Sequence, residues 1–312
     1  MSKVIATGSY VPSKVVTNAD LIQETGIDST DEWIVKRTGI QQRAFADADE
    51  TVSDLAVKAA ENLLGQLDAD IAKEIQLIVV ATMSSRLPTP SVASQVQRAL
   101  DIPSAWAFDI SGACSGFVMA LEAAEKLSRD KQSGYTLVIG AEKMSAILDF
   151  SDRGTSILFG DGAGALLIEH DGTGLLEYES ELVSIPDEED SICVSEPDGF
   201  MTMEGRSVFN FVLRQVIPSL ADFIETKVGA FDYIISHQAN HRFLEIIAKK
   251  MNVPIEKIPS NISEVANTSA ASIPILLDEL VADSRIRLDA TQKVVMVGYG
   301  GGLSWGQISL QL

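Results

Sequence analysis

Cys114 lies in a short stretch whose residue types suit nucleophilic chemistry. The stretch reads DISGACSGFVMAL, from Asp109 to Leu121. The run before the cysteine has the length and alternation of a strand, and apolar residues from Phe117 onward recur at helical spacing. The small residues around the thiol permit a sharp turn. Because the N-terminus of a helix stabilises negative charge, we expect the pKa of the Cys114 thiol to be lowered. The competing interpretation is that Cys114 is a small buried hydrophobic residue.

His237 and Asn267 are the residues that could act with such a cysteine in acyl transfer. His237 follows an apolar strand and opens HQANHRFLEIIAKK, and Asn267 lies in NTSAASIP before the helical run IPILLDEL. A thiolate attacks, an imidazole donates or shuttles a proton, and a carboxamide stabilises oxyanion charge. Taken singly, His237 fits a structural role, in the core or as a helix cap, as well as it fits a catalytic one. Asn267 taken singly fits a helix cap better than a catalytic role.

Four other kinds of site match parts of these motifs. The order Cys, His, Asn occurs in papain-like proteases, but their local signature is absent. GACSG has the form of a hydrolase elbow, although the required acid cannot be placed. HQANH carries Gln238 where a zinc protease has its general-base glutamate. GDGAGA, residues 160–165, matches a dinucleotide fingerprint, but both flanking runs read as strands, so we expect a tight hairpin there.

A repeat in the chain predicts how the three residues meet. Three pairs of segments resemble each other at offsets of 153 to 158 residues: LIVVAT with DYIISH, the run around Cys114 with the run around Asn267, and YTLVIG with KVVMVG. A nearly constant offset predicts a duplicated α/β unit with sheets covered on both faces. We expect one half, residues 1–172, to carry the cysteine and the other, residues 173–312, to carry the histidine and asparagine.

Composition restricts the class of protein. The 312 residues include 24 Lys and Arg against 44 Asp and Glu, and the formal net charge of −20 argues against a nucleic-acid partner. Two cysteines make no disulfide framework, and neither a signal peptide nor a membrane span is recognised. We therefore expect a soluble cytoplasmic protein with no membrane partner. The polar stretch 186–199 is expected to be a surface loop in which Cys193 is incidental.

The motifs together resemble those of the β-ketoacyl-acyl carrier protein synthase III family, a group of the thiolase superfamily that initiates fatty acid synthesis. They run in the order TNADL, DEWIVKRTGI, ACSGF, DRGTSILFGDGAGA, HQAN, NTSAASIP and GGGLSWG. The resemblance implies a thiolase-type α/β fold, with two halves in five αβαβα layers, and a homodimer. It implies neither a metal nor a cofactor. Gly112 and Ala266 stand where alanine and glycine are common in the family, and both remain small.

The resemblance also implies a mechanism. Cys114 takes an acyl group from a short acyl-coenzyme A, acetyl-coenzyme A foremost, with the backbone N–H groups of Cys114 and Gly301 as the oxyanion hole. Malonyl-acyl carrier protein then loses CO2, and His237 and Asn267 stabilise the enolate that attacks the acyl-cysteine. The product is a 3-oxoacyl-acyl carrier protein. Water must be excluded because it would hydrolyse the acyl-enzyme.

Binding roles follow from the same resemblance. Trp33, Arg37 and Arg153 are expected at the adenine end of coenzyme A, where an indole and guanidinium groups can stack or pair with phosphate. Asn240 is expected at the pantetheine arm. From the residues alone, structural roles would be preferred over coenzyme A binding. Trp33 would pack in the core, and Arg37 would place a favourable charge at the C-terminus of a helix.

Two further features concern the carrier protein and the primer. Arg242, Lys249 and Lys250, on the helix after the HQAN motif, are hypothesised to receive the acidic carrier protein, and a solvated basic helix end is the alternative. Thr89 stands where the family often has a large apolar residue that closes the primer pocket across the dimer. We therefore expect butyryl or branched primers to fit as well, unless Thr89 only packs a turn between prolines.

Three functional alternatives stay open. A cysteine-dependent thioester hydrolase would use the same thiol but release free acid. A related condensing enzyme of secondary metabolism would share the fold and the motifs. An acyl-carrier-binding protein without activity is the remaining alternative.

Overall fold

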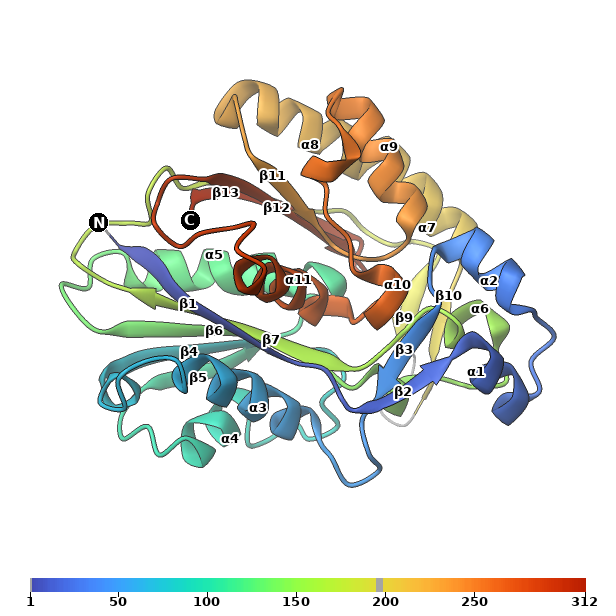
Figure 1. Ribbon diagram of the computed structural model, residues 1–312, viewed down its shortest axis with the longest axis horizontal. Coiled ribbons are helices and arrows are strands. Elements are labelled where there is room, and N and C mark those ends of the chain that lie inside the picture. Colours follow the sequence, from blue (N-terminus) through green and yellow to red (C-terminus); the bar gives the residue numbers. More distant parts are fainter. Residues whose placement is uncertain (1, 195–198) are drawn as a thin grey trace.

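Two β-sheets stacked face to face form the body of the protein (Figure 1). The computed structural model describes residues 2–194 and 199–312. The first sheet has the strand order β1 (Lys3–Tyr10), β7 (Gly162–Glu169), β6 (Tyr135–Glu142), β4 (Ile75–Ala81) and β5 (Trp106–Ile110). The second sheet has the order β11 (Tyr233–Ser236), β12 (Lys293–Gly300), β13 (Ser304–Gln311) and β8 (Glu179–Ser184).

Helices cover the outer faces of this pair of sheets and fill the space between them (Figure 1). The central layer consists of α5 (Gly116–Ser128) and α11 (Ser272–Ala282). The first sheet is covered on its outer face by α3 (Val52–Leu64) and α4 (Val92–Ala99). The second is covered by α7 (Gly205–Phe211), α8 (Ile217–Phe223) and α9 (His241–Met251). This αβαβα arrangement confirms the predicted five-layer fold.

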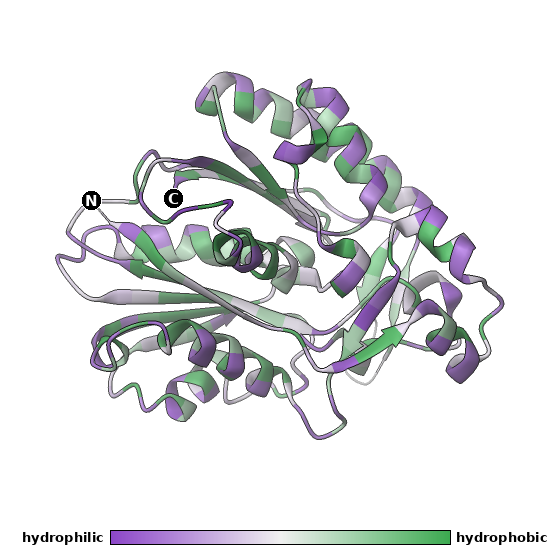
Figure 2. Ribbon diagram, in the orientation of Figure 1, coloured by the Kyte–Doolittle hydropathy of each residue, from purple (hydrophilic) through white to green (hydrophobic). Residues whose placement is uncertain are grey.

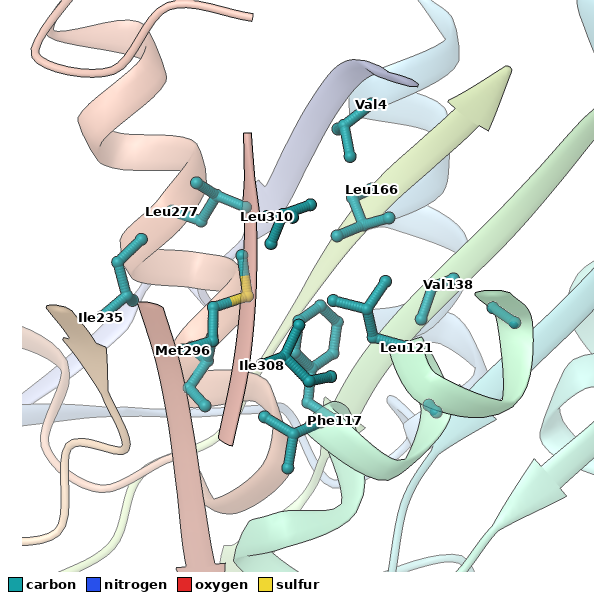
Figure 3. Close-up of a cluster of buried hydrophobic side chains, with 14 of the residues drawn as sticks. Val4, Phe117, Leu121, Val138, Leu166, Ile235, Leu277, Met296, Ile308 and Leu310 are labelled. Carbon is teal, nitrogen blue, oxygen red and sulfur yellow. The ribbon is translucent and has the colours of Figure 1, made fainter. Parts of the chain in front are cut away.

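The two central helices are buried because both sheets turn an apolar face towards them. In Figure 3, Phe117 and Leu121 of α5 and Leu277 of α11 belong to one apolar cluster with Leu166 of the first sheet and Ile308 of the second. The sequence of α11, SIPILLDELVA, is apolar almost all round, which is typical of a helix enclosed by protein. The outer helices instead alternate hydrophobic and hydrophilic faces (Figure 2).

The strand order repeats between the sheets and confirms the duplication read from the chain. In the first sheet β4 pairs parallel with β6, and β6 pairs antiparallel with β7. In the second sheet β11 pairs parallel with β12, and β12 pairs antiparallel with β13. β1 and β8 extend the two sheets antiparallel in the same way. The division between residues 172 and 173 stays a prediction.

Smaller elements gather at one end of the two sheets, on the right in Figure 1. β2 (Lys14–Thr17) pairs with β3 (Gln42–Phe45), and β9 (Ile192–Val194) pairs with β10 (Met201–Met203). The short helices there are α1 (Asn18–Thr25), α2 (Asp31–Thr38), α6 (Arg153–Ser156) and α10 (Ile262–Val265). No helix within the described residues is long and apolar enough to cross a membrane.

Two local expectations were wrong. The run SILF, residues 156–159, is not a strand, so the hairpin predicted at residues 160–165 does not form. The Asp152 side chain instead caps α6 by accepting the Gly154 N–H, and Phe159 bridges to Asn267 before the chain enters β7.

The stretch 186–199, predicted as a loop, contains the whole of β9. Cys193 lies in that strand, with its Sγ 3.2 Å from Thr202 Oγ1 in β10. Residues 195–198 lie outside the described residues.

Candidate active site

A cavity of about 720 Å³ opens at the end of the molecule where the small elements gather. Its walls come from α2, α6, the paired strands β9 and β10, the start of α7 and the start of α9. Cys114, His237 and Asn267 all line it, so the structure brings the three candidate residues to one space. The volume lies within the usual range for small-molecule sites.

Cys114 is held by a strand, a turn and a helix, as its sequence predicted. β5 ends at Ile110, the 3-10 turn η2 (Ala113–Ser115) follows, and α5 begins at Gly116. Gly300, at the end of β12, packs against the turn so closely that a Cβ there would lie 2.9 Å from the Cys114 Cβ. Only glycine allows this approach, and it leaves the thiol 9% exposed at the floor of the cavity.

The thiol pKa differs from the expectation. Burial, and to a smaller extent the nearby Glu142 carboxylate, raise the pKa of Cys114 to about 12. The Sγ lies within hydrogen-bond distance of Ser269 Oγ, at 3.5 Å. The stabilisation of a thiolate by this hydroxyl opposes the shift only in part. The loss of hydration, which raises the thiol pKa, therefore outweighs the lowering effect of the helix N-terminus. At neutral pH Cys114 is a thiol, and it needs a group that removes its proton.

His237 is a buried neutral imidazole. It follows β11 directly, and its Nδ1 lies 2.7 Å from Ser272 Oγ at the start of α11. The ring packs edge-on against Tyr299, with 5.2 Å between ring centroids. Burial lowers the pKa of His237 to about 3. With Nδ1 engaged, Nε2 is the ring nitrogen available to the cavity.

Asn267 has its amide orientation set by the backbone. Its Oδ1 accepts the N–H of Ser269 at 2.8 Å, in the turn η7 (Ser269–Ala271) that precedes α11. Among the described residues its Nδ2 has no hydrogen-bond partner, so the NH2 group is the donor left for the cavity. The capping contact and the expected catalytic role therefore use opposite ends of one side chain.

The mouth of the cavity carries an aromatic ring between two arginines. The Arg153 and Arg37 guanidinium carbons lie 4.8 and 5.4 Å from the Trp33 ring centroid. Trp33 is 37% exposed, so it is not a core residue. Asn240 Nδ2 donates to the Arg37 carbonyl at 3.0 Å, and its Oδ1 caps α9 by accepting the Arg242 N–H. Together these groups can hold a planar, negatively charged ligand.

Comparisons with known proteins agree with this geometry. The family model for 3-oxoacyl-(acyl-carrier-protein (ACP)) synthase III matches residues 108–182, and the model for its C-terminal part matches residues 222–312. A curated β-ketoacyl-acyl-carrier-protein synthase III of Streptococcus mutans is 42% identical, over all of this chain and 99% of its own length. The chain belongs to the 3-oxoacyl-acyl-carrier-protein synthase III family. It is an acyltransferase that initiates fatty acid synthesis.

Solved structures of the family superpose over nearly the whole chain. The synthase III of Aquifex aeolicus matches with a TM-score of 0.91 and 36% identity, covering all of both chains. The priming β-ketosynthase of the R1128 polyketide pathway matches with a TM-score of 0.89 and 32% identity, covering all of this chain and 96% of that one. The thiolase-type fold is therefore shared by synthases of both kinds.

Four residues expected in the site are not brought to the cavity by the single chain. Gly301 follows Gly300, and a Cβ on it would lie 3.6 Å from the Ala113 Cβ; the oxyanion role of its N–H stays a prediction. Thr89 is exposed and lies outside the cavity lining, and its expected role requires a second copy. Arg242 lines the mouth, whereas Lys249 and Lys250 are exposed in the last turn of α9.

Other residues of this synthase site were missed from the sequence. Arg206, at the start of α7, also lines the cavity, in addition to Arg37, Arg153 and Arg242. The only feature of the sequence that marks Arg206 is a basic residue after a glycine at the start of a helix. Ser269 and Ser272 appear within NTSAASIP, but serines in that run read as helix caps. Glu142 ends an apolar strand, and nothing in the sequence shows that it faces Cys114.

Proposed function

We propose that this synthase condenses a short acyl-coenzyme A with malonyl-acyl carrier protein through an acyl group on Cys114. One observation carries the proposal. The Trp33–arginine cluster and the Cys114–His237–Asn267 group line the same cavity, at its mouth and its floor. A ligand with a charged planar head and a reactive tail would span the two. The reaction requires neither a metal nor a redox cofactor.

In the first half-reaction the head of coenzyme A binds at the mouth and its thioester reaches Cys114. The adenine stacks on Trp33, and Arg37 and Arg153 pair with phosphate groups. The Cys114 sulfur forms a bond to the acyl carbon, the bond from that carbon to the coenzyme A sulfur breaks, and coenzyme A leaves as a thiol. The N–H groups of Cys114 and Gly301 stabilise the oxyanion.

In the second half-reaction the bond from the malonyl carboxylate to the neighbouring carbon breaks and CO2 leaves. The electron pair of that bond forms a thioester enolate. Ser272 Oγ accepts the Gln238 N–H at 3.4 Å, so its own proton can point to His237 Nδ1. That arrangement leaves His237 with a proton on Nε2, and it donates without being charged. His237 Nε2 and Asn267 Nδ2 then stabilise the enolate, whose carbon bonds to the acyl carbon as the bond from that carbon to the Cys114 sulfur breaks. The sulfur leaves as a thiolate and takes up one proton from solvent.

Carrier docking and primer length complete the proposal. The face of α9 with Arg242, Lys249 and Lys250 receives the acidic carrier protein, since the chain elsewhere is strongly acidic. Lys249→Glu with Lys250→Glu should raise the KM for malonyl-acyl carrier protein and leave acylation by acetyl-coenzyme A unchanged. Equal losses in both half-reactions would contradict this assignment.

Thr89 of a second copy bounds the primer pocket in the proposed homodimer. A threonine leaves room for a longer primer, and each buried methylene contributes about 0.8 kcal/mol. Butyryl- and branched acyl-coenzyme A should therefore be accepted in addition to acetyl-coenzyme A. The measurement is the ratio of kcat/KM for butyryl- over acetyl-coenzyme A, which Thr89→Phe should lower. An unchanged ratio would remove Thr89 from the pocket.

The deciding experiment is intact-mass analysis after incubation with acetyl-coenzyme A. The proposal expects one stable acetyl adduct that is absent in Cys114→Ala, and a 3-oxobutanoyl product after malonyl-acyl carrier protein is added. Rapid release of acetate would indicate a thioester hydrolase. The likeness to the R1128 priming synthase makes a polyketide primer the second candidate. A preference for a polyketide carrier protein over the fatty acid carrier protein would support it.

A further inference from the structure

Glu142, at the end of β6, is a fully buried carboxylate that has no role in the two half-reactions proposed above. Its Oε2 accepts the Ser84 hydroxyl at 2.5 Å, the Ser84 N–H at 3.1 Å and the Thr82 hydroxyl at 3.2 Å. The Met83 N–H contacts both oxygens, at 3.2 and 3.3 Å. Every one of these partners donates, so the pocket is built to hold the ionised form.

Ser269 connects this carboxylate to the nucleophile. The Cys114 Sγ lies 3.5 Å from Ser269 Oγ, and Ser269 Oγ lies 3.1 Å from Glu142 Oε1. An ionised carboxylate has no proton, so the serine hydroxyl must donate to it. The serine oxygen is then free to accept the thiol proton. The two hydrogen bonds therefore run in one direction, from sulfur to hydroxyl to carboxylate.

We propose that Ser269 relays the Cys114 proton to Glu142 as the sulfur attacks a thioester. The inference rests on the proposed function, because it names the groups that activate its nucleophile. Ser269 contacts the reacting sulfur and is a catalytic residue. Glu142 acts through Ser269 and is a positioning residue that also holds the proton.

The protons and electrons balance over the two steps of acyl transfer. The Cys114 S–H proton moves to Ser269 Oγ while the Ser269 hydroxyl proton moves to Glu142 Oε1, and the sulfur electron pair forms the bond to the acyl carbon. When the bond to coenzyme A breaks, the proton returns from Glu142 through Ser269 to the departing sulfur. Coenzyme A leaves as a thiol, and Glu142 is again a carboxylate.

The ionisation of Glu142 suits this task near neutral pH. Burial raises the pKa of Glu142 to about 7, against the lowering effect of its hydrogen bonds to Ser84, Met83, Ser269 and Thr82. The groups that face it come from the segment after β4 and from η7, and Cys114 across the relay is the titratable one among them. The adjacent Lys143 sends its Nζ away, to the Asp47 carbonyl at 2.6 Å.

The test is the pH dependence of Cys114 alkylation by iodoacetamide, which requires no acyl-coenzyme A. In the wild type the rate should rise with a midpoint near pH 7, where Glu142 loses its proton. Ser269→Ala should lose this midpoint and react about 100-fold more slowly at pH 8, as expected for a missing general-base pathway. Alanine keeps the backbone at the Ser269 position, where φ is 50°, no more strained than serine does.

The chain offers a matched control for the serine substitution. Ser145 Oγ donates to Asp161, another carboxylate whose pKa is raised by burial, at 2.6 Å. Ser145→Ala should leave the alkylation profile unchanged. A wild-type profile without a midpoint near pH 7, or one that Ser269→Ala does not alter, would overturn the relay.

A second variant and a second reaction separate the relay from the proposed function. Glu142→Gln, if it folds, should show the same loss as Ser269→Ala, and a wild-type profile in it would also overturn the relay. Acylation by acetyl-coenzyme A should fall about 100-fold in Ser269→Ala. If Ser269→Ala is acylated at the wild-type rate, the relay is wrong and the proposed function stands. If the wild type is alkylated as expected but never acylated, the proposed function is wrong, and the proton path from Cys114 through Ser269 to Glu142 stands without it.

Discussion

The two halves carry the same turn before their central helix but use it for different chemistry. η2 begins at Ala113 and η7 at Ser269, and these first residues have positive φ angles of 45° and 50°. The helices α5 and α11 each begin three residues after that first residue. Cys114 is the second residue of η2, and Ala270 is the second residue of η7, so these two residues correspond. The sequence repeat had paired the run around Cys114 with the run around Asn267. The first turn presents the nucleophile, and the second presents polar groups around it.

The turns also pack reciprocally across the duplication. A Cβ on Gly298, in β12 of the second sheet, would lie 3.2 Å from the Cys114 carbonyl oxygen. A Cβ on Gly140, in β6 of the first sheet, would overlap the Ala270 carbonyl oxygen. Each turn therefore rests on a strand of the other sheet. The comparison teaches that neither half can form its part of the site alone.

The largest expected effect is a division of labour between the two turns. Cys114→Ala should abolish acyl-enzyme formation and condensation, because no other group replaces the sulfur. Asn267→Ala and His237→Ala should still be acylated but lose about 10² to 10³ in the decarboxylation rate, the usual cost of one oxyanion donor. Single-turnover acylation and malonyl decarboxylation are measured separately. A His237→Ala enzyme that decarboxylates normally but forms no acyl-enzyme would reverse these roles.

The reciprocal packing can be broken at its two glycines. Gly140→Ala should destabilise by about 3 kcal/mol, because the new methyl group meets backbone that cannot move alone. Gly298→Ala should cost about 1 kcal/mol, since its nearest contacts lie at 3.1 to 3.2 Å and can yield slightly. Urea unfolding midpoints provide the comparison. Gly205→Ala, which has open space around its Cβ position, is the control and should not destabilise. Equal losses at the two glycines would show that the packing is symmetrical.

The sequence predicted the architecture better than the electrostatics of the site. The periodicities around Cys114 and Asn267 depend on neighbours in the chain, so the strand, turn and helix at each site were predictable. The thiol pKa depends on Ser269, Glu142 and Gly300, which are distant in sequence, and so it was predicted with the wrong sign. The run SILF has a strand's composition, but the cap of α6 and the bridge of Phe159 to Asn267 decide its conformation.

A smaller effect is expected where the second turn departs from its ideal backbone. Ala266, directly before Asn267, has φ 60° and ψ −156°, a region that glycine adopts and other residues enter with strain. Ala266→Gly should therefore stabilise by about 1 kcal/mol, because the released strain exceeds the entropy that glycine loses on folding. Thermal unfolding measures the change. Ala270→Gly, which removes a buried methyl group without such strain, should instead destabilise.

The smallest change is expected in the pH dependence of the second half-reaction, whose rate should not vary between pH 5 and 8. Burial lowers the pKa of His237 to about 3, so its imidazole stays neutral and Nε2–H remains a donor throughout pH 5 to 8. Decarboxylation of malonyl-acyl carrier protein by Cys114→Ala, which cannot form an acyl-enzyme, should therefore be flat over that range. Acylation of the wild type should rise near pH 7 with the ionisation of Glu142. If decarboxylation instead fell below pH 6.5, His237 would be titrating there, and the two turns would not differ as the structure indicates.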